Sequence, residues 1–299
     1  MKQLYPGIGL RVICELFGKT RQSHYKQQWA EDKQAMRDAI IIKRVKEIRT
    51  DMPRIGTRKL QFLLTDILLQ HEIQIGRDLL FDLLSEYGML IRKRKRKKVY
   101  TTDSNHPFRK YPNLIKELIV IQANQLWVSD ITYISLIGRF AYLSLITDAY
   151  SRKIIGYCLY PTLEKEGPLI ALKMAIDNNQ LSAGMIHHSD RGLQYCCTAY
   201  ISTLTNNGIS ISMTEQGDPY ENAIAERVNG ILKTEFEISK TFPTLESAQQ
   251  TIQKAIWTYN EQRPHASCNY LTPSQAHKVQ GVLKSRWKKK KYKASVPLQ

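Results

Sequence analysis

The sequence predicts an α/β fold in which an all-helical N-terminal region precedes a mixed five-stranded sheet. Two observations predict this fold. Up to about residue 90 the apolar residues recur at helical spacing, whereas after about residue 124 strand-length segments rich in Ile, Val, Tyr and Leu dominate. Three of these strand segments follow one another directly. Helical stretches then alternate with two further strand segments. This order is typical of an α/β domain whose sheet contains both antiparallel and parallel strands.

The helical region is divided by residues that break helices. Gly18 interrupts the first apolar stretch, and Thr20 can cap the next one. Pro53 stops a longer helix, and Gly88 ends the last. The expected helices are two short ones within residues 1–28 and three more over 33–50, 57–70 and 76–87. Such helices are typical of helix-turn-helix units, which place one helix in the major groove of DNA; a helical packing domain without DNA contact is the alternative.

The sheet region divides into strands and helices by the same patterns. We expect strands over 126–135, 140–147, 154–160, 185–188 and 209–213, and helices over 166–178, 198–207 and 223–236. Gly138 and Arg139 supply the turn between the first two strands. Trp127, in the first strand, is expected in the core rather than as a platform on which bases stack.

The positive charge of the chain lies at its two ends. The formal net charge is +17, with 44 Lys and Arg against 27 Asp and Glu. Residues 1–100 carry 22 of these basic residues against 11 acidic ones. Residues 281–299 carry 7 basic residues and no acidic one, so the middle of the chain is nearly neutral. Lys and Arg neutralise phosphates and release counterions. We therefore expect the flanks to bind nucleic acid, the alternatives being a solubilising surface or a basic membrane patch.

A run of basic residues separates the helical region from the sheet region. Its members are Arg92, Lys93, Arg94, Lys95, Arg96, Lys97 and Lys98. Consecutive like charges repel one another and stay solvated, so we expect a linker that binds DNA phosphates; a nuclear-localisation signal has the same composition. The predicted organisation is a helix-turn-helix-like DNA-binding region over 1–90, a basic linker over 91–123, a core domain over 124–240, and a C-terminal helical extension with a basic tail over 241–299.

Cysteine usage and hydropathy indicate where the chain resides. The five cysteines form no C-x-x-C pair and leave an odd count, which argues against a disulfide framework and favours a reducing compartment. The first residues contain no apolar signal stretch, and no run of about 18 apolar residues occurs, so we expect neither export nor a membrane span. The expected location is the cytoplasm.

Three acidic residues on different predicted elements are candidates for chemistry. Asp130 lies inside an apolar strand, where an ionised carboxylate is costly unless it is paired or binds a metal. Asp190 follows the fourth predicted strand, at the start of a loop. Glu226 lies on the helix that begins after Asn222, and helical geometry points it away from the apolar face of that helix. Lys233 shares the face of Glu226.

Three carboxylates without a His or Cys cluster suit hard cations such as Mg²⁺ or Mn²⁺. Two such ions can activate an attacking oxygen and stabilise a leaving one during displacement at phosphorus. The residues alone leave the alternative open that the three acids are unrelated and form surface salt bridges.

The segments around these acids resemble a known family. The segments are W-V-S-D-I-T-Y-I at 127–134, H-S-D-R-G-L-Q-Y at 188–195 and G-D-P-Y-E-N-A-I-A-E-R-V-N-G-I-L-K-T-E at 217–235. They resemble the three motifs of insertion-sequence transposases in the retroviral integrase superfamily, and more narrowly the bacterial subfamily whose catalytic part is encoded in a second open reading frame. Asp190 and Glu226 are separated by 35 residues and Lys233 follows seven residues later, as in that family.

Further segments extend the resemblance over nearly the whole chain. Residues 259–276, from Y-N-E-Q-R-P-H to L-T-P-S-Q-A, are similar to the C-terminal signature of the family. The segments L-R-V-I-C-E-L-F-G and I-G-T-R-K-L resemble its helix-turn-helix region. One departure is Glu221, where Asp is more usual; Glu221 is a rival third acid but lacks the 35-residue spacing.

The resemblance implies a fold, an activity and a site. The fold is a ribonuclease H-like core, and the activity is DNA strand cleavage and strand transfer at the ends of a mobile element. The implied catalytic and metal-binding residues are Asp130, Asp190 and Glu226, with two Mg²⁺ or Mn²⁺ ions per active site, and Lys233 would contact DNA. The implied partners are double-stranded DNA, further copies of the chain when bound to DNA, and a DNA-binding protein from an upstream frame, in a bacterial cytoplasm near the nucleoid.

Two other functions compete with this one. A ribonuclease H-like nuclease would cleave without joining, but the helix-turn-helix region and the 259–276 signature count against it. A DNA-binding protein with an inactive core would not need all three acids.

Overall fold

The computed structural model describes residues 7–91, 107–215 and 222–283. The chain forms two compact units, one made of residues 1–50 and 56–91 and the other of residues 51–55 and 92–299. The basic run Arg92–Lys98, the rival acid Glu221 and the basic tail lie outside the described residues. The predicted four-part division of the chain stays a prediction.

The first unit is helical, as predicted. Its helices are α1 Leu10–Leu16, α2 Arg21–Asp51, α3 Thr57–Leu63, α4 Thr65–Gln70 and α5 Arg77–Glu86. The hydroxyl of Thr20 accepts a 3.1 Å hydrogen bond from the backbone N–H of Ser23, which is the capping role expected of it. Gly88 ends α5 with φ +64°, a left-handed conformation that suits glycine.

Two of the predicted helix boundaries in this unit are wrong. The sequence pattern predicts a break between residues 28 and 33, but α2 is one continuous helix of 31 residues. No Pro or Gly occurs within α2, so nothing in the segment stops a helix once it has started. The predicted helix over 57–70 is instead divided at Leu64 into α3 and α4.

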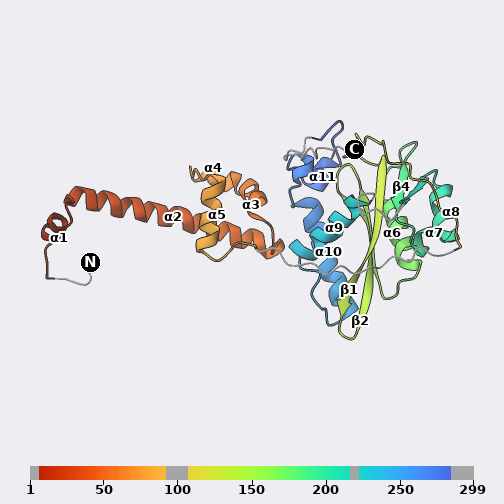
Figure 1. Ribbon diagram of the computed structural model, residues 1–299, viewed down its shortest axis with the longest axis horizontal. Helices are drawn as coiled ribbons and strands as arrows, with labels where there is room; N and C mark the ends of the chain where they lie inside the picture. Colours follow the sequence, from red (N-terminus) through yellow and green to blue (C-terminus); the bar gives the residue numbers. More distant parts are fainter. Residues whose placement is uncertain (1–6, 92–106, 216–221, 284–299) are drawn as a thin grey trace, which may run out of the picture. The chain divides into compact units, whose positions relative to one another are not determined.

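The second unit is built on the mixed five-stranded sheet that the sequence predicts (Figure 1). The strands are β1 Leu126–Leu136, β2 Arg139–Asp148, β3 Ile154–Tyr160, β4 Ile186–Ser189 and β5 Ser210–Met213. Their order across the sheet is β3-β2-β1-β4-β5. The pairs β1–β2 and β2–β3 are antiparallel, whereas β1–β4 and β4–β5 are parallel. The central strand β1 therefore joins the two halves of the sheet.

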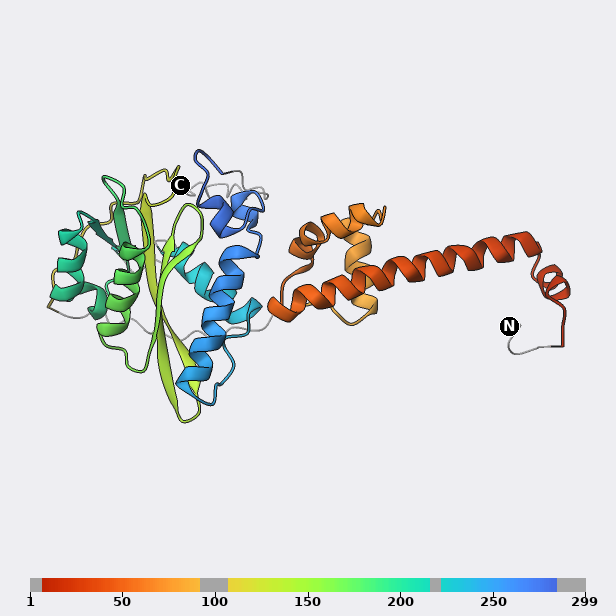
Figure 2. The same ribbon diagram turned by 180° about the vertical axis from the view of Figure 1, so that it is seen from behind.

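Helices cover both faces of this sheet (Figure 2). They are α6 Glu166–Asp177, α7 Leu193–Cys196, α8 Thr198–Asn206, α9 Ala223–Glu235, α10 Leu245–Glu261 and α11 Pro273–Ala276. Trp127 packs with residues of α6 and α8, as its predicted core position requires. Its neighbours Leu126 and Val128 pack instead with Ala225 of α9. Because side chains alternate along a strand, α9 lies on the face of β1 opposite to α6 and α8.

Close packing of α6 on the sheet depends on Gly156 in β3. A Cβ atom at this position would overlap the carbonyl oxygen of Ala171 and would lie 2.9 Å from the Cβ of Ala175. Real Cβ atoms do not approach other heavy atoms so closely. Only glycine therefore lets the helix backbone sit this near to the strand.

Side chains from α10 occupy the outer edge of the sheet. Asn260 accepts a 3.0 Å hydrogen bond from the N–H of Ile154 and donates a 2.9 Å bond to its carbonyl. Tyr259 donates to the carbonyl of Arg152 at 2.9 Å. These bonds satisfy backbone groups beside β3 that a further strand would otherwise use. In the parts of the chain that the structure describes, no helix is long and apolar enough to cross a membrane.

Candidate active site

Asp130 and Asp190 are brought side by side by the pairing of β1 with β4. These strands are parallel, with Val128 opposite His188. Asp130 comes two residues after Val128, and Asp190 two residues after His188, so both follow the paired segment at the same end. Asp130 is partly buried within β1, and Asp190 lies just beyond the last residue of β4. Two acids 60 positions apart in the sequence therefore lie next to each other in the middle of the sheet.

Glu226 lies in the first turn of α9 and is exposed. The buried positions of the helix are Ala225, Val228, Asn229, Ile231 and Leu232. Glu226 therefore points away from the core, as predicted.

The start of α9 is tied directly to β1. Asn222 is the N-cap residue of the helix, as predicted, but its side chain makes no capping hydrogen bond. Its amide instead donates a 2.9 Å bond to the carbonyl of Ser129, the residue before Asp130. A second amide, that of Asn229, donates a 2.7 Å bond to Oδ2 of Asp130. The two asparagines fix the helix that carries Glu226 against the strand that carries Asp130.

The charges of the three acids act on one another. The pKa of Asp130 is raised to about 7, first by burial, then by the charge of Asp190, and to a smaller extent by that of Glu226. The hydrogen bond from Asn229 opposes this shift. Like charges raise a carboxyl pKa only when they are close. The structure therefore brings the predicted acids into one electrostatically coupled site.

The oxygen donors of this site fit a hard divalent cation. Among the described residues, no three His, Cys, Asp or Glu side chains form a ready-made metal-binding group. Mg²⁺, however, is usually held by one or two carboxylates together with substrate phosphates and water. Asp130 and Asp190 supply two such carboxylates on adjacent strands, and a cation would offset the burial and the like charges that raise the pKa of Asp130.

Gly192 fixes the loop that carries Asp190. Its N–H donates a 3.0 Å hydrogen bond to Oδ1 of Asp190. A Cβ atom on Gly192 would lie only 3.0 Å from that same oxygen. A side chain at this position would therefore crowd the carboxylate that the backbone amide holds.

Lys233 lies on α9, about two turns beyond Glu226. Its Nζ is 4.1 Å from the centroid of the Tyr133 ring. Burial lowers the pKa of Lys233, and the charge of Asp130 acts in the opposite direction. The lysine therefore lies within electrostatic reach of the acids, while its contact with DNA stays a prediction.

Polar side chains that sequence reasoning did not assign to the site are buried beneath it. The hydroxyls of Ser129 and Tyr200 lie 2.6 and 3.0 Å from Nε2 of His187. Burial, and next the neighbouring His188, lower the pKa of His187 to about 3, so its ring is neutral, and its tautomer decides which groups donate in these contacts. This histidine has a structural role in the core.

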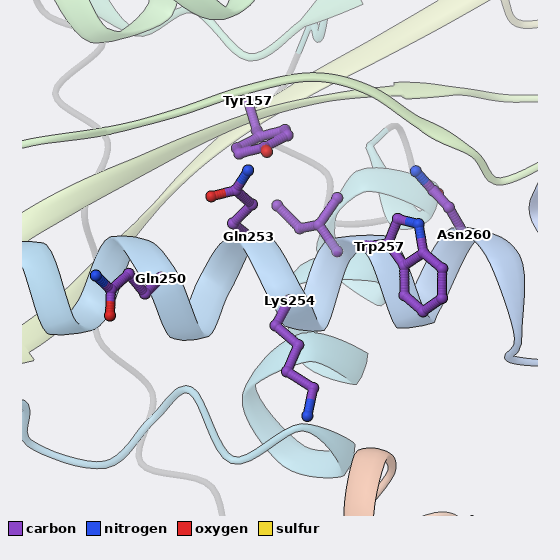
Figure 3. Close-up of a pocket in the computed structure, with 7 residues that line it drawn as sticks. Tyr157, Gln250, Gln253, Lys254, Trp257 and Asn260 are labelled. Carbon is purple, nitrogen blue, oxygen red and sulfur yellow. The ribbon is translucent and has the colours of Figure 1, made fainter.

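The pocket shown in Figure 3 is separate from these acids. It lies between α10 and β3, where Tyr157, Gln253 and the half-exposed Trp257 line it. None of the three candidate acids contributes to its wall. It plays no part in the site described here.

Comparison with known families defines the class of this protein. The chain matches the integrase core domain family over residues 121–219 and a second integrase core domain family over residues 207–273. The first match contains Asp130 and Asp190, and the second contains Glu226. The second unit therefore contains an integrase core, the catalytic domain of DDE polynucleotidyl transferases.

Relatives extend this similarity to the rest of the chain. An uncharacterized 31 kDa protein of insertion element IS600 from Shigella sonnei is 34% identical over 88% of this chain and 96% of its own length. The IS629 transposase from the same organism is 28% identical over 91% of this chain and 92% of its own length. The IS904 transposase of Lactococcus lactis is 34% identical over 56% of this chain and 67% of its own length. The chain belongs to the insertion-sequence transposases of the DDE superfamily.

Among solved structures, the chain is similar to the HTLV-2 integrase catalytic core domain in complex with magnesium. That similarity has 20% identity and a TM-score of 0.42, and covers 52% of this chain and 97% of the integrase domain.

The predicted activity is confirmed by the family. The protein is a polynucleotidyl transferase that cleaves DNA and transfers strands in the transposition of a mobile element. This finding argues against both alternatives, the nuclease that does not join and the DNA-binding protein with an inactive core.

Proposed function

We propose that Asp130, Asp190 and Glu226 are the catalytic acids of this transposase. The observation that carries the proposal is the register of β1 and β4, which sets the two aspartates side by side. The effect of Glu226 on the pKa of Asp130 supports the third member. The asparagine bonds between α9 and β1 would hold the three carboxylates in a fixed arrangement.

These acids would hold Mg²⁺ or Mn²⁺, two ions per active site. When bound, such ions lower the pKa of an attacking water or 3′-hydroxyl and offset the negative charge that develops on the leaving oxygen. The chain supplies the rest by positioning. Asn229 holds one oxygen of Asp130, and Gly192 holds one oxygen of Asp190, so each carboxylate is fixed in orientation.

The DNA would be held by basic residues. Lys233 would contact a phosphate near the reacting bond, and the run Arg92–Lys98 would bind duplex phosphates. The substrates would be the ends of the element and the target DNA. We further propose that the protein assembles into a homo-oligomer on DNA, works with a DNA-binding protein from an upstream frame, and resides in the bacterial cytoplasm at the nucleoid.

Strand transfer by purified variants tests the catalytic assignment. Wild-type protein and Asp190→Asn are incubated with element-end DNA and Mg²⁺ or Mn²⁺, and joined products are separated by size. Asp177→Asn, an exposed aspartate at the end of α6, is the matched control. We expect joining by wild type and the control and none by Asp190→Asn. Equal joining by Asp190→Asn, or joining without a divalent metal, would show that the proposed mechanism is wrong.

The identity of the third acid needs its own pair of variants. Glu226→Gln and Glu221→Gln are compared in the same assay, each at equal protein concentration. Glu226→Gln should abolish joining, whereas Glu221→Gln should retain it. The reverse result would assign the role to Glu221.

A further inference from the structure

Tyr195 carries a buried hydroxyl for which the structure provides no partner. Only 3% of the residue is exposed, and no hydrogen-bonding atom of the described residues reaches its hydroxyl. The ring itself is well packed, with its centroid 5.3 Å from that of Tyr200 in an edge-to-face contact. Packing therefore explains why an aromatic ring occupies this position, but it does not explain the hydroxyl.

Two neighbouring hydroxyls in this part of the core do have a partner. Those of Tyr200 and Ser129 both reach Nε2 of His187. A buried polar group that lacks a partner costs free energy that phenylalanine would avoid. The hydroxyl of Tyr195 is therefore best explained by a partner that it meets in the working enzyme.

The position of Tyr195 indicates which partner that is. A Cβ atom placed on Gly192 would lie 3.0 Å from Oδ1 of Asp190 and 3.7 Å from Cδ2 of Tyr195, so the carboxylate and the ring flank the same glycine. Burial is the main cause that raises the pKa of Tyr195, followed by Tyr200 and then by the charges of Asp190 and Asp130. The hydroxyl thus stays protonated and can donate to an acid.

We propose that Tyr195 is a positioning residue of the active site, whose hydroxyl donates a hydrogen bond to a water molecule that in turn donates to the carboxylate of Asp190. The proposal rests on the assignment of Asp190 as a metal-binding acid. Carboxylates that bind metals are themselves held by hydrogen bonds from a surrounding layer of side chains. The backbone of Gly192 supplies one such bond to Asp190. The water-mediated bond from Tyr195 would be a second one, from the buried side.

Two phenylalanine variants separate this role from a structural one. Tyr195→Phe keeps the packed ring and removes only the unpaired hydroxyl, whereas Tyr200→Phe removes a hydroxyl that is bonded to His187. The affinity of each full-length variant for Mn²⁺ is measured by calorimetry, and the melting temperature is measured without metal. Tyr195→Phe should bind Mn²⁺ about tenfold more weakly with an unchanged or higher melting temperature. Tyr200→Phe should melt a few degrees lower, by roughly 4 °C, and bind Mn²⁺ like wild type.

Asp190→Asn in the same titration keeps the two proposals distinguishable. If Asp190→Asn loses Mn²⁺ binding while Tyr195→Phe binds like wild type, the role of Tyr195 is overturned and the acidic site stands. If Asp190→Asn also binds like wild type, the metal-binding site itself is overturned. A lower melting temperature for Tyr195→Phe with unchanged Mn²⁺ affinity would assign the hydroxyl to the core.

Discussion

The side-chain amide of Asn229 donates a 2.7 Å hydrogen bond to Oδ2 of Asp130. The bond connects the helix that carries Glu226 to the strand that carries Asp130. Of the interactions that lower the pKa of Asp130, this hydrogen bond has the largest effect. Burial and the two neighbouring carboxylates favour the protonated form of Asp130, whereas the amide favours the ionised form. The asparagine therefore helps keep Asp130 in the state that a metal ion requires.

This balance predicts how stability changes with pH when no metal is present. The pKa of Asp130 is about 7 in the folded protein and 3.8 ordinarily. Between these values the folded state binds more protons than the unfolded state, so the contribution of Asp130 to stability falls as pH rises and levels off above about 7. The unfolding free energy of wild type, compared with that of Asp130→Asn in urea titrations, should decline over this window. In Asn229→Leu, which cannot donate, the decline should extend to higher pH.

A difference between wild type and Asp130→Asn that stays constant from pH 4 to 8 would contradict this prediction. The exposed variant Asp177→Asn provides the control, since its difference from wild type should show no such decline.

The strands are the part of the fold that the sequence pattern predicts best. Ile154–Tyr160 forms the third strand with the bounds expected of it, because a continuous apolar segment between turn residues has few other structures available. The length of α2 is predicted poorly, because its boundary was expected where no Gly or Pro breaks the helix. Local patterns thus identify elements more reliably than they identify where a helix ends.

The candidate site is predicted only in part, for a related reason. A charge inside an apolar strand marks Asp130 from the sequence alone. Its proximity to Asp190, however, depends on the register of β1 with β4, and register arises from the packing of the whole sheet. The hydrogen bond from Asn229 to Asp130 could not be predicted from the sequence either. Its spacing of three residues from Glu226 places it near that acid, but only the structure shows that it turns towards Asp130.

Gly156→Ala is predicted to destabilise the integrase core. The added methyl group would force α6 away from β3, because it meets the backbone of Ala171 and the side chain of Ala175. Overpacking of this kind costs about 1–3 kcal/mol. Thermal unfolding measures the effect, and Gly76→Ala is the control, since a Cβ atom there has nothing within 4 Å. Equal melting temperatures for the two variants would show that α6 can shift without cost.

Arg263→Met is predicted to be more damaging. The guanidinium of Arg263 is 1% exposed and bonds both oxygens of Glu235, at 2.8 and 2.9 Å, which joins the end of α9 to the segment after α10. Removing one partner of a buried ion pair costs about 3–5 kcal/mol, because the remaining charge is left in the interior. The double variant Arg263→Met, Glu235→Leu should recover part of that loss in urea unfolding. A double variant that is less stable than Arg263→Met would mean that Glu235 has a separate stabilising role.

Lys233→Gln is predicted to weaken DNA binding while leaving the fold intact. The lysine lies over Tyr133 and within reach of the charge of Asp130, where a phosphate approaching the acids would need a compensating cation. Loss of one phosphate contact should lower DNA affinity and reduce the slope of log affinity against log salt by about 1. Fluorescence anisotropy over a range of salt concentrations measures both quantities. Lys240→Gln is the matched control, because Lys240 also lies over an aromatic ring, 5.2 Å from that of Phe242, in the segment after α9. If the two variants lose the same slope, Lys233 contributes only to the general positive charge of the protein and does not contact a phosphate at the active site.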